Sequence, residues 1–355
     1  MMSERVQGLL LGLGAAMLFG ASAPAVKLLL PGTGILALTA LLYLGAGIAV
    51  TVARLTLRVA TKAGGASPEA ALRKPDLPSL AGIVVLGGAV APALMVFGLA
   101  HTSGVTGALL LNLEAPFTIG LAVTLFGEHL TRLELGAAGC TMAGALALSV
   151  VPGPWSAEPL GVLPLAGACL CWAVDNNLSQ RLSAKDPFQI VQVKTLGAGI
   201  GTALLALLLG QSWPTPGRVV GALGLGALSY GVSLVLDMRA LRLLGAAREA
   251  AVFSLAPFMG AVLSIPLLGE RPVGLQAVAA ALMAAGVWLL FRARHAHAHT
   301  HEALAHEHLH THDEHHRHPH PEGTPPEPHS HPHQHRSLTH AHPHVSDAHH
   351  RHKHH

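Results

Sequence analysis

The sequence predicts an all-α integral membrane protein with ten transmembrane helices and a polar C-terminal tail. The chain has 355 residues, of which 51% are apolar and 12% are charged, and its mean hydropathy is +0.47. Soluble domains carry about 25% charged residues, so this composition cannot cover a water-facing surface. The apolar runs are long and do not alternate, which excludes the strands of a membrane β-barrel and leaves helices.

Ten apolar segments approach or reach the roughly 17 to 25 residues that cross a hydrocarbon core of about 30 Å. Turn signals such as Pro31-Gly32 and Asp186-Pro187 separate them. The first segment continues past Phe19 to Leu30 without a small-residue cleavage site, so we expect it to be retained. The predicted spans are 8–29, 34–57, 78–100, 104–126, 132–151, 160–181, 188–210, 218–238, 246–268 and 273–292.

The distribution of Lys and Arg predicts the orientation, because loops that stay in the cytoplasm are enriched in both. The connections and ends on one side of the predicted helices hold thirteen basic residues, whereas those on the other side hold three: Lys27, Arg218 and Arg271. Both termini, and with them the tail, are therefore expected in the cytoplasm. The thirteen are Arg5, Arg54, Arg58, Lys62, Arg73, Lys74, Arg132, Arg181, Lys185, Arg239, Arg242, Arg292 and Arg294.

A short motif occurs twice and indicates an internal repeat. Leu113-Glu114-Ala115-Pro116-Phe117 is followed by Gly127-Glu128, and Ser254-Leu255-Ala256-Pro257-Phe258 is followed by Gly269-Glu270. The motif lies in the fourth and the ninth span, and we interpret each Gly-Glu pair as a turn signal. Because each unit then has five spans, an odd number, the second copy must be inverted in the membrane. The predicted units are 1–151, 152–294 and the tail 295–355.

These motifs resemble those of the EamA family of the drug/metabolite transporter superfamily. The resemblance covers residues 8–292 and includes Phe19-Gly20-Ala21-Ser22, Ala25-Val26-Lys27 and the Glu114 motif. It implies a secondary carrier in the bacterial inner membrane, with its binding site between the two halves. Members of that family export amino acids, metabolites and drugs, so the resemblance does not identify the cargo. The segment 172–177 and the His-rich end resemble a bacterial subgroup of that family.

Glu114 is the first candidate site residue, because it lies near the middle of the fourth predicted span. A carboxylate there costs about 2.5 to 3.5 kcal/mol on insertion scales, so it must face a cavity, find a partner or stay protonated. One hypothesis is a proton-coupling or substrate-contacting role. The alternative is a neutral acid that bonds to a backbone carbonyl near the helix break at Pro116.

Asp175 and Lys194 form the second candidate site. They lie on consecutive antiparallel spans, about equally far from the connection between them, so a rise of about 1.5 Å per residue places them at similar depth. The pair has either a gating or substrate role or a purely structural one. Asn176 and Asn177 follow the acid, and side-chain amides within a membrane need partners or a polar cavity.

Lys27 and two prolines complete the candidates within the membrane. Lys27 lies near the end of the first span, where we expect it to snorkel to the headgroups. Its match to the family's first-span Lys keeps it as a candidate for the binding site. Pro116 and Pro257 occupy matching places in the repeat and free backbone carbonyls that neighbours or cargo can satisfy.

The tail has a different chemistry, because 24 of the 26 histidines follow Arg294. Its composition, without apolar periodicity, predicts disorder. Neutral imidazole suits Zn, Ni or Co, so metal capture or sensing is one hypothesis and a merely solvated tail is the other. The candidate ligands are His297, His299, His306, His308, His315 and His316.

Together these features predict a secondary active exporter of a small metabolite. The alternatives are a divalent metal carrier or metal-regulated carrier, and a metal-binding membrane scaffold that transports nothing. No span pairs a nucleophile with a base, so an enzyme is not indicated, and no cofactor is required. The net charge of +3 does not indicate a nucleic acid partner. The expected partners are the lipid bilayer, a small molecule and divalent metals, and the sequence leaves the oligomeric state open.

Overall fold

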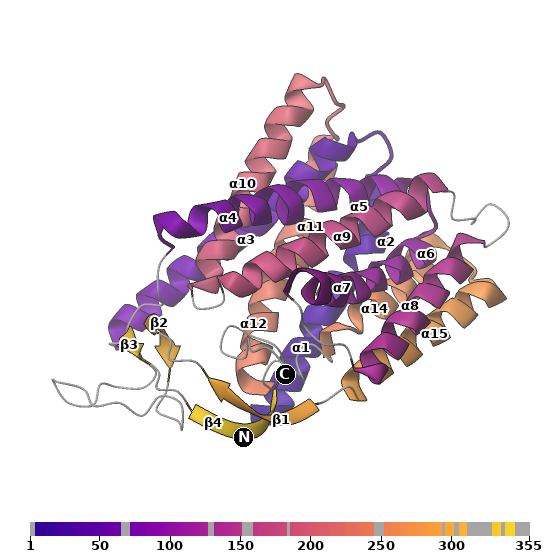
Figure 1. The fold of residues 1–355 in the computed structure, drawn as a ribbon. Helices are drawn as coiled ribbons and strands as arrows, with labels where there is room; N and C mark the ends of the chain where they lie inside the picture. Colours follow the sequence, from indigo (N-terminus) through magenta and orange to yellow (C-terminus); the bar gives the residue numbers. More distant parts are fainter. Residues whose placement is uncertain are drawn as a thin grey trace.

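Up to Arg292 the described chain is almost entirely helical (Figure 1). This computed structural model describes residues 4–64, 72–126, 131–150, 159–182, 185–244 and 252–292. In the tail it describes the backbone of residues 295–301, 305–310, 329–334 and 338–344.

Ten helical segments, some made of consecutive pieces, match the ten predicted spans. Those of the first half are α1 (Glu4–Gly20) with α2 (Ser22–Leu29), α3 (Ile35–Gly64), η1 (Lys74–Asp76) with α4 (Leu77–Gly82), η2 (Ile83–Val90) and α5 (Ala91–Ala100), α6 (Gly104–Leu110) with η3 (Leu111–Leu113) and α7 (Glu114–Phe126), and α8 (Arg132–Ser149). Those of the second half are α9 (Pro159–Arg181), α10 (Pro187–Leu208), α11 (Pro216–Gly226) with η4 (Ala227–Val232) and α12 (Ser233–Leu244), α14 (Ala256–Leu268), and α15 (Gly274–Arg292).

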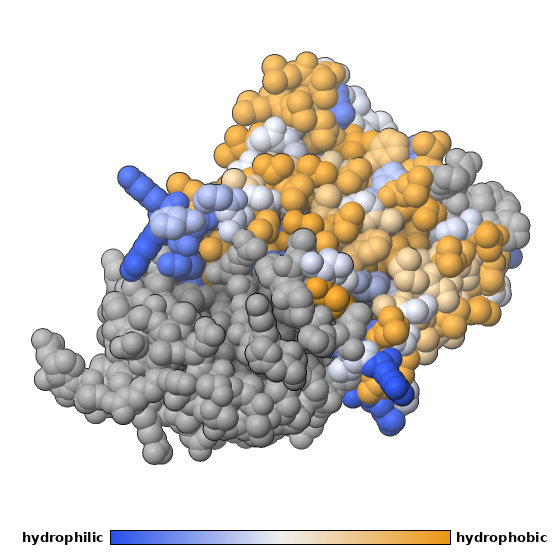
Figure 2. Space-filling view, in the orientation of Figure 1, coloured by the Kyte–Doolittle hydropathy of each residue, from blue (hydrophilic) through white to orange (hydrophobic). Residues whose placement is uncertain are grey.

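The surface of the helices is apolar, as a lipid environment requires. Seven described segments are long and apolar enough to cross a membrane, and α14 is a shorter apolar helix. Large apolar side chains such as Leu163 and Leu208 are 69% and 83% exposed. Figure 2 shows orange side chains over much of the described helical surface, with blue ones mainly at its margins. The protein is therefore a multi-pass membrane protein.

The two halves are interleaved, and their contacts repeat when the halves are exchanged. Three contacts join corresponding spans directly: α3 packs on α10, α6 on α14 and α8 on α15. Further contacts form matched pairs, since α1 packs on α12 and α14 while α9 packs on α5 and α7. This pattern is that of two five-helix repeats related by an approximate twofold axis.

Contacts near the ends of the spans show that the second and the seventh span, which correspond in the repeat, run in opposite directions. At one end of the bundle, Gly34 after the first span donates to the Ser212 carbonyl after the seventh, at 2.8 Å. At the other end, Arg54 near the end of the second span pairs with Asp186 before the seventh, at 2.8 Å. The second repeat therefore starts at the opposite end from the first, so the two repeats are inverted.

Proline accounts for two departures from α-helical geometry in the first half. In η2, a π-helical segment, the Ala91 N–H bonds to the Leu86 carbonyl five residues back, and Pro92 follows without an N–H. In the fourth span, the 3₁₀ segment η3 precedes Pro116, and the Glu114 N–H bonds to the Leu111 carbonyl. In the second half, η4 is also π-helical, and α14 begins just before Pro257.

In the tail the structure describes the backbone of two strand pairs. Strands β1 (His295–His301) and β4 (Leu338–His344) pair antiparallel, and β2 (Ala305–His310) pairs antiparallel with β3 (His329–Gln334). Apolar periodicity is missing, but the alternation of His with another residue has the two-residue period of a strand.

Candidate functional site

Asp175 and Lys194 form a buried ion pair between α9 and α10. The Lys194 Nζ donates to Asp175 Oδ2, and the Asp175 side chain is only 5% exposed. The second oxygen, Oδ1, is buried and accepts from no described residue. A carboxylate oxygen in this position is costly unless a donor reaches it, so a water or a bound molecule with an N–H or O–H group fits there.

Gly87 in η2 brings the first half against this pair. A methyl group at Gly87 would overlap the Asp175 carboxylate, so a larger residue there would displace that side chain from its present position. The Gly87 carbonyl accepts from the Tyr43 hydroxyl at 3.2 Å and from Trp172 Nε1 at 3.1 Å. In a π-helix a carbonyl accepts from the N–H five residues further on, which for Gly87 is position 92. Pro92 has no N–H, so this backbone donor is missing. Two aromatic side chains thus replace the missing backbone donor.

Aromatic rings gather around this contact although the chain contains few. Tyr43 and Tyr230, the two tyrosines of the sequence, stack with ring centroids 5.9 Å apart. Phe19 meets Tyr230 edge to face at 5.7 Å and lies 5.2 Å from Phe253. These rings come from spans 1, 2, 8 and 9 and therefore from both halves. Sequence reasoning missed them, because scattered single aromatics in apolar spans carry no pattern.

Glu114 joins the cluster through the amide of Asn176. Glu114 Oε1 accepts from Asn176 Nδ2 at 2.7 Å, and the glutamate is half-buried. Asn177 donates to the Ala173 carbonyl at 2.8 Å and to the Thr118 carbonyl at 3.4 Å. The two asparagines therefore link α9 to α7, and Glu114 bonds to a side chain and not to a carbonyl. We call Glu114, Asp175, Asn176 and Lys194, with Tyr43 and Trp172, the central cluster.

Lys27, which we expected to snorkel to the headgroups, finds its partners within the protein. Its ammonium donates to the Leu99 carbonyl at 2.7 Å and to the Thr102 carbonyl. These carbonyls lie at the C-terminal end of α5, where a helix favours a cation. Neither acceptor belongs to the central cluster. The backbone at the end of another span therefore accepts hydrogen bonds from this ammonium.

Glu270 caps a helix of the opposite half, a role that sequence analysis missed. Its carboxylate accepts from the Gly104 N–H at 2.6 Å and the Val105 N–H at 2.9 Å, and the residue is 4% exposed. Gly269, with φ +66°, turns the chain into position after α14. The signal was present, because the Gly-Glu pair recurs in the repeat. Glu128 of the first pair lies outside the described residues.

Replacing Glu270 by Ala should lower the free energy of unfolding by about 0.5 to 2 kcal/mol, as for other lost N-terminal caps. It should also slow transport, since the cap joins the halves. Glu134→Ala is the matched control, because Glu134 bonds to Thr131 within its own span, at 2.8 Å. Thermal unfolding in detergent and flux measure the two effects. Equal transport by both variants would contradict a role for this contact beyond capping.

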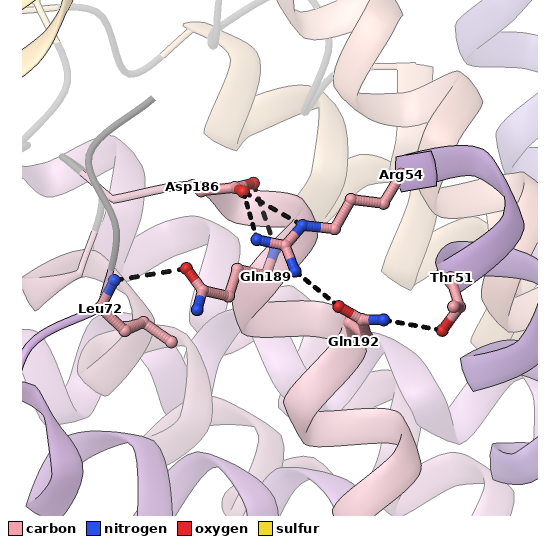
Figure 3. A network of polar contacts seen from close by, with 6 residues as sticks. All are labelled: Thr51, Arg54, Leu72, Asp186, Gln189 and Gln192. Carbon is pink, nitrogen blue, oxygen red and sulfur yellow. Dashed lines mark hydrogen bonds and ion pairs between the residues drawn. The ribbon is translucent and has the colours of Figure 1, made fainter. Parts of the chain in front are cut away.

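At the opposite end, a polar network joins α3 to α10 (Figure 3). Arg54 Nη2 donates to Asp186 Oδ2 at 2.8 Å, and its Nη1 donates to Gln192 Oε1 at 2.7 Å. Gln192 Nε2 donates in turn to Thr51 Oγ1 at 2.9 Å. Nearby, Gln189 Oε1 accepts from the Leu72 N–H at 3.3 Å. Sequence analysis used Arg54 only as a sign of orientation.

Arg54→Gln should destabilise this end of the protein by about 1.5 to 3 kcal/mol, the usual value of a hydrogen bond to a charged group. Thr51→Val removes one neutral bond of the same network and should cost about 1 kcal/mol. Thermal unfolding of the two variants in detergent measures the difference. Equal midpoints would show that the ion pair adds nothing to the network.

The histidines of the tail fall partly within the described strands. His297 and His299 lie in β1, and His306 and His308 lie in β2, whereas His315 and His316 lie outside the described residues. Among the described residues searched, no three His, Cys, Asp or Glu side chains gather as a metal site.

Known proteins match the chain over both helical halves. An uncharacterized transporter of Methanothermobacter thermautotrophicus is 29% identical over 301 residues, which cover 81% of this chain and 87% of the relative. A solved crystal structure is 22% identical and covers 80% of this chain and 96% of its own, with a TM-score of 0.59, which shows the fold. The EamA-like transporter family matches residues 6–150 and 159–292, one match for each half. This chain therefore belongs to the EamA-like transporter family and is a membrane transporter, not an enzyme.

Proposed function

We propose that the protein is a secondary active exporter of a small metabolite in the bacterial inner membrane. Both termini face the cytoplasm, and alternating access between the two inverted halves moves the cargo. The central cluster is the observation that carries the proposal, because the first half contributes Tyr43 and Glu114 while the second contributes Asp175 and Lys194. A site shared by the halves changes whenever one half moves against the other.

The chemistry of the central cluster favours a cargo that donates hydrogen bonds. Asp175 pairs with Lys194 through Oδ2, and its Oδ1 has no donor among the described residues. An amine, amide or hydroxyl group of the cargo would complete this oxygen. The rings of Tyr43 and Trp172 would cover an apolar part of the same molecule, as is common in small-molecule sites.

The two ends of the bundle supply contacts that can open in turn. Glu270 with the start of α6 closes one end, and Arg54 with Asp186 closes the other. In the proposed cycle each contact breaks while the other holds. Both bonds join elements of different halves, so a rocking motion acts on them directly.

A thermal-shift screen of the purified protein tests the proposal. The probes are amino acids, sugars, nucleosides and divalent metal salts, each added to wild type and to Asp175→Asn. We expect one organic class to raise the unfolding midpoint of wild type but not of the variant, and to be transported in proteoliposomes. Stabilisation by divalent metals alone, followed by metal flux, would favour the metal-carrier alternative. An absence of any flux despite specific binding would favour the scaffold.

A further inference from the structure

Spans 3 and 8 depart from α-helical geometry at the same place in the repeat. In η2 the Ala91 N–H bonds to the Leu86 carbonyl, five residues back. In η4 the Ser233 N–H bonds to the Leu228 carbonyl, again five residues back. Each residue of the second bond lies 142 positions after its counterpart in the first, which is also the offset between the two Gly-Glu pairs. The two π-helical segments are therefore a feature of the repeat, and such segments are rare and frequent at functional sites.

A proline accompanies only the first of the two segments. Pro92 follows η2 and lacks an N–H, whereas the corresponding position after η4 is Leu234, which has one. What the segments share is their packing between the halves. The segment η2 packs on α9 and α10, and η4 packs on α1 and α3, which are the matching spans of the other half.

Tyr43 of α3 contacts both π-helical segments. Its hydroxyl donates to the Gly87 carbonyl in η2 at 3.2 Å. Its ring stacks on Tyr230 of η4, with centroids 5.9 Å apart and an interplanar angle of 28°. The Tyr230 hydroxyl in turn lies 3.9 Å from the Met95 sulfur, in the span that contains η2. Tyr43 is 5% exposed, so one buried side chain links the two segments.

We infer that Tyr43 couples η2 to η4, so that spans 3 and 8 bend together when the halves exchange positions. Helices bend where a π-helical segment interrupts the regular hydrogen bonds. The segment η2 also borders the ion pair, since a methyl group at Gly87 would overlap the Asp175 carboxylate. Tyr43 is therefore a positioning residue, which holds the segment beside Asp175 and links its position to that of η4. The inference rests on the alternating access of the proposed function.

Amide hydrogen exchange, resolved by segment on the full chain in detergent, tests the coupling without any cargo. Tyr43→Phe keeps the ring that stacks on Tyr230 and removes the hydroxyl that donates to η2. Trp172→Phe is the matched control, because Trp172 Nε1 donates to the same Gly87 carbonyl at 3.1 Å. Trp172 belongs to α9, which packs chiefly on α5, α7 and η2. The control therefore weakens the hold on η2 while Tyr43 still links the segments.

We expect Tyr43→Phe to speed amide exchange about 2- to 10-fold in both η2 and η4, as for one lost hydrogen bond. Trp172→Phe should speed exchange in η2 alone. A tyrosine that only supported η2 would leave η4 at the wild-type rate, and that result would overturn the inference. An equal rise in η4 in both variants would overturn it too, as would a uniform rise that includes α15, which packs on α8 and α6. None of these outcomes bears on the cargo screen, so the two proposals fail separately.

Discussion

Asp175→Asn is expected to reduce transport about 100-fold or more while the protein still inserts in the membrane. Asparagine carries no charge, so the Lys194 ammonium is left without a counter-charge in every conformation in which it is buried. Removing one partner of a buried ion pair costs about 3 to 5 kcal/mol, and each 1.4 kcal/mol is about a factor of ten in population. Flux into proteoliposomes, normalised to inserted protein, measures the effect.

A double variant distinguishes a role in transport from a role in packing. Asp175→Asn combined with Lys194→Gln removes both charges, so the thermal unfolding midpoint should return toward that of wild type. Transport should remain low, because the cargo still lacks the carboxylate. If the double variant transported normally, the ion pair would serve only to pack α9 against α10.

Gly226→Ala should be among the most destabilising substitutions in the helices. A methyl group at Gly226 in α11 would overlap the Leu42 carbonyl of α3, and one at Gly45 in α3 would overlap the Leu223 carbonyl of α11. Such close approach is typical of small residues between membrane helices. Overpacking costs about 1 to 3 kcal/mol, and here the obstacle is backbone, so we expect the upper end of that range.

Gly224→Ala is the matched control within the same helix. Gly224 is exposed, and a methyl group there would meet no neighbouring helix of the described chain within 4 Å. Alanine favours a helix interior over glycine by about 0.5 to 1 kcal/mol, so this variant should be neutral or slightly stabilised. Thermal unfolding in detergent compares the two. Equal loss of stability in both variants would refute the close contact of α3 with α11.

The ten helices could be predicted from composition and from the length of the apolar segments, because a bilayer requires apolar side chains and sets the length of each span. Counting residues from the connection also brought Asp175 and Lys194 to the same depth, and the structure places them in contact. The contacts of Gly87 and Glu270 were not predictable in this way. Glu270 bonds to a helix start 166 positions away in the chain. The Gly87 carbonyl accepts from two aromatic side chains of other spans, and no sequence pattern indicates which side chains these are.

The interleaving of the halves has a consequence for biosynthesis. Because α1, α3 and α8 find their main neighbours among α12, α10 and α15, the first five spans leave the ribosome before the helices that will cover them exist. Glu114 must likewise enter the lipid before Asn176 has been translated. The nascent first half therefore waits in the bilayer as an open assembly, and its polar groups are satisfied only when the last spans arrive.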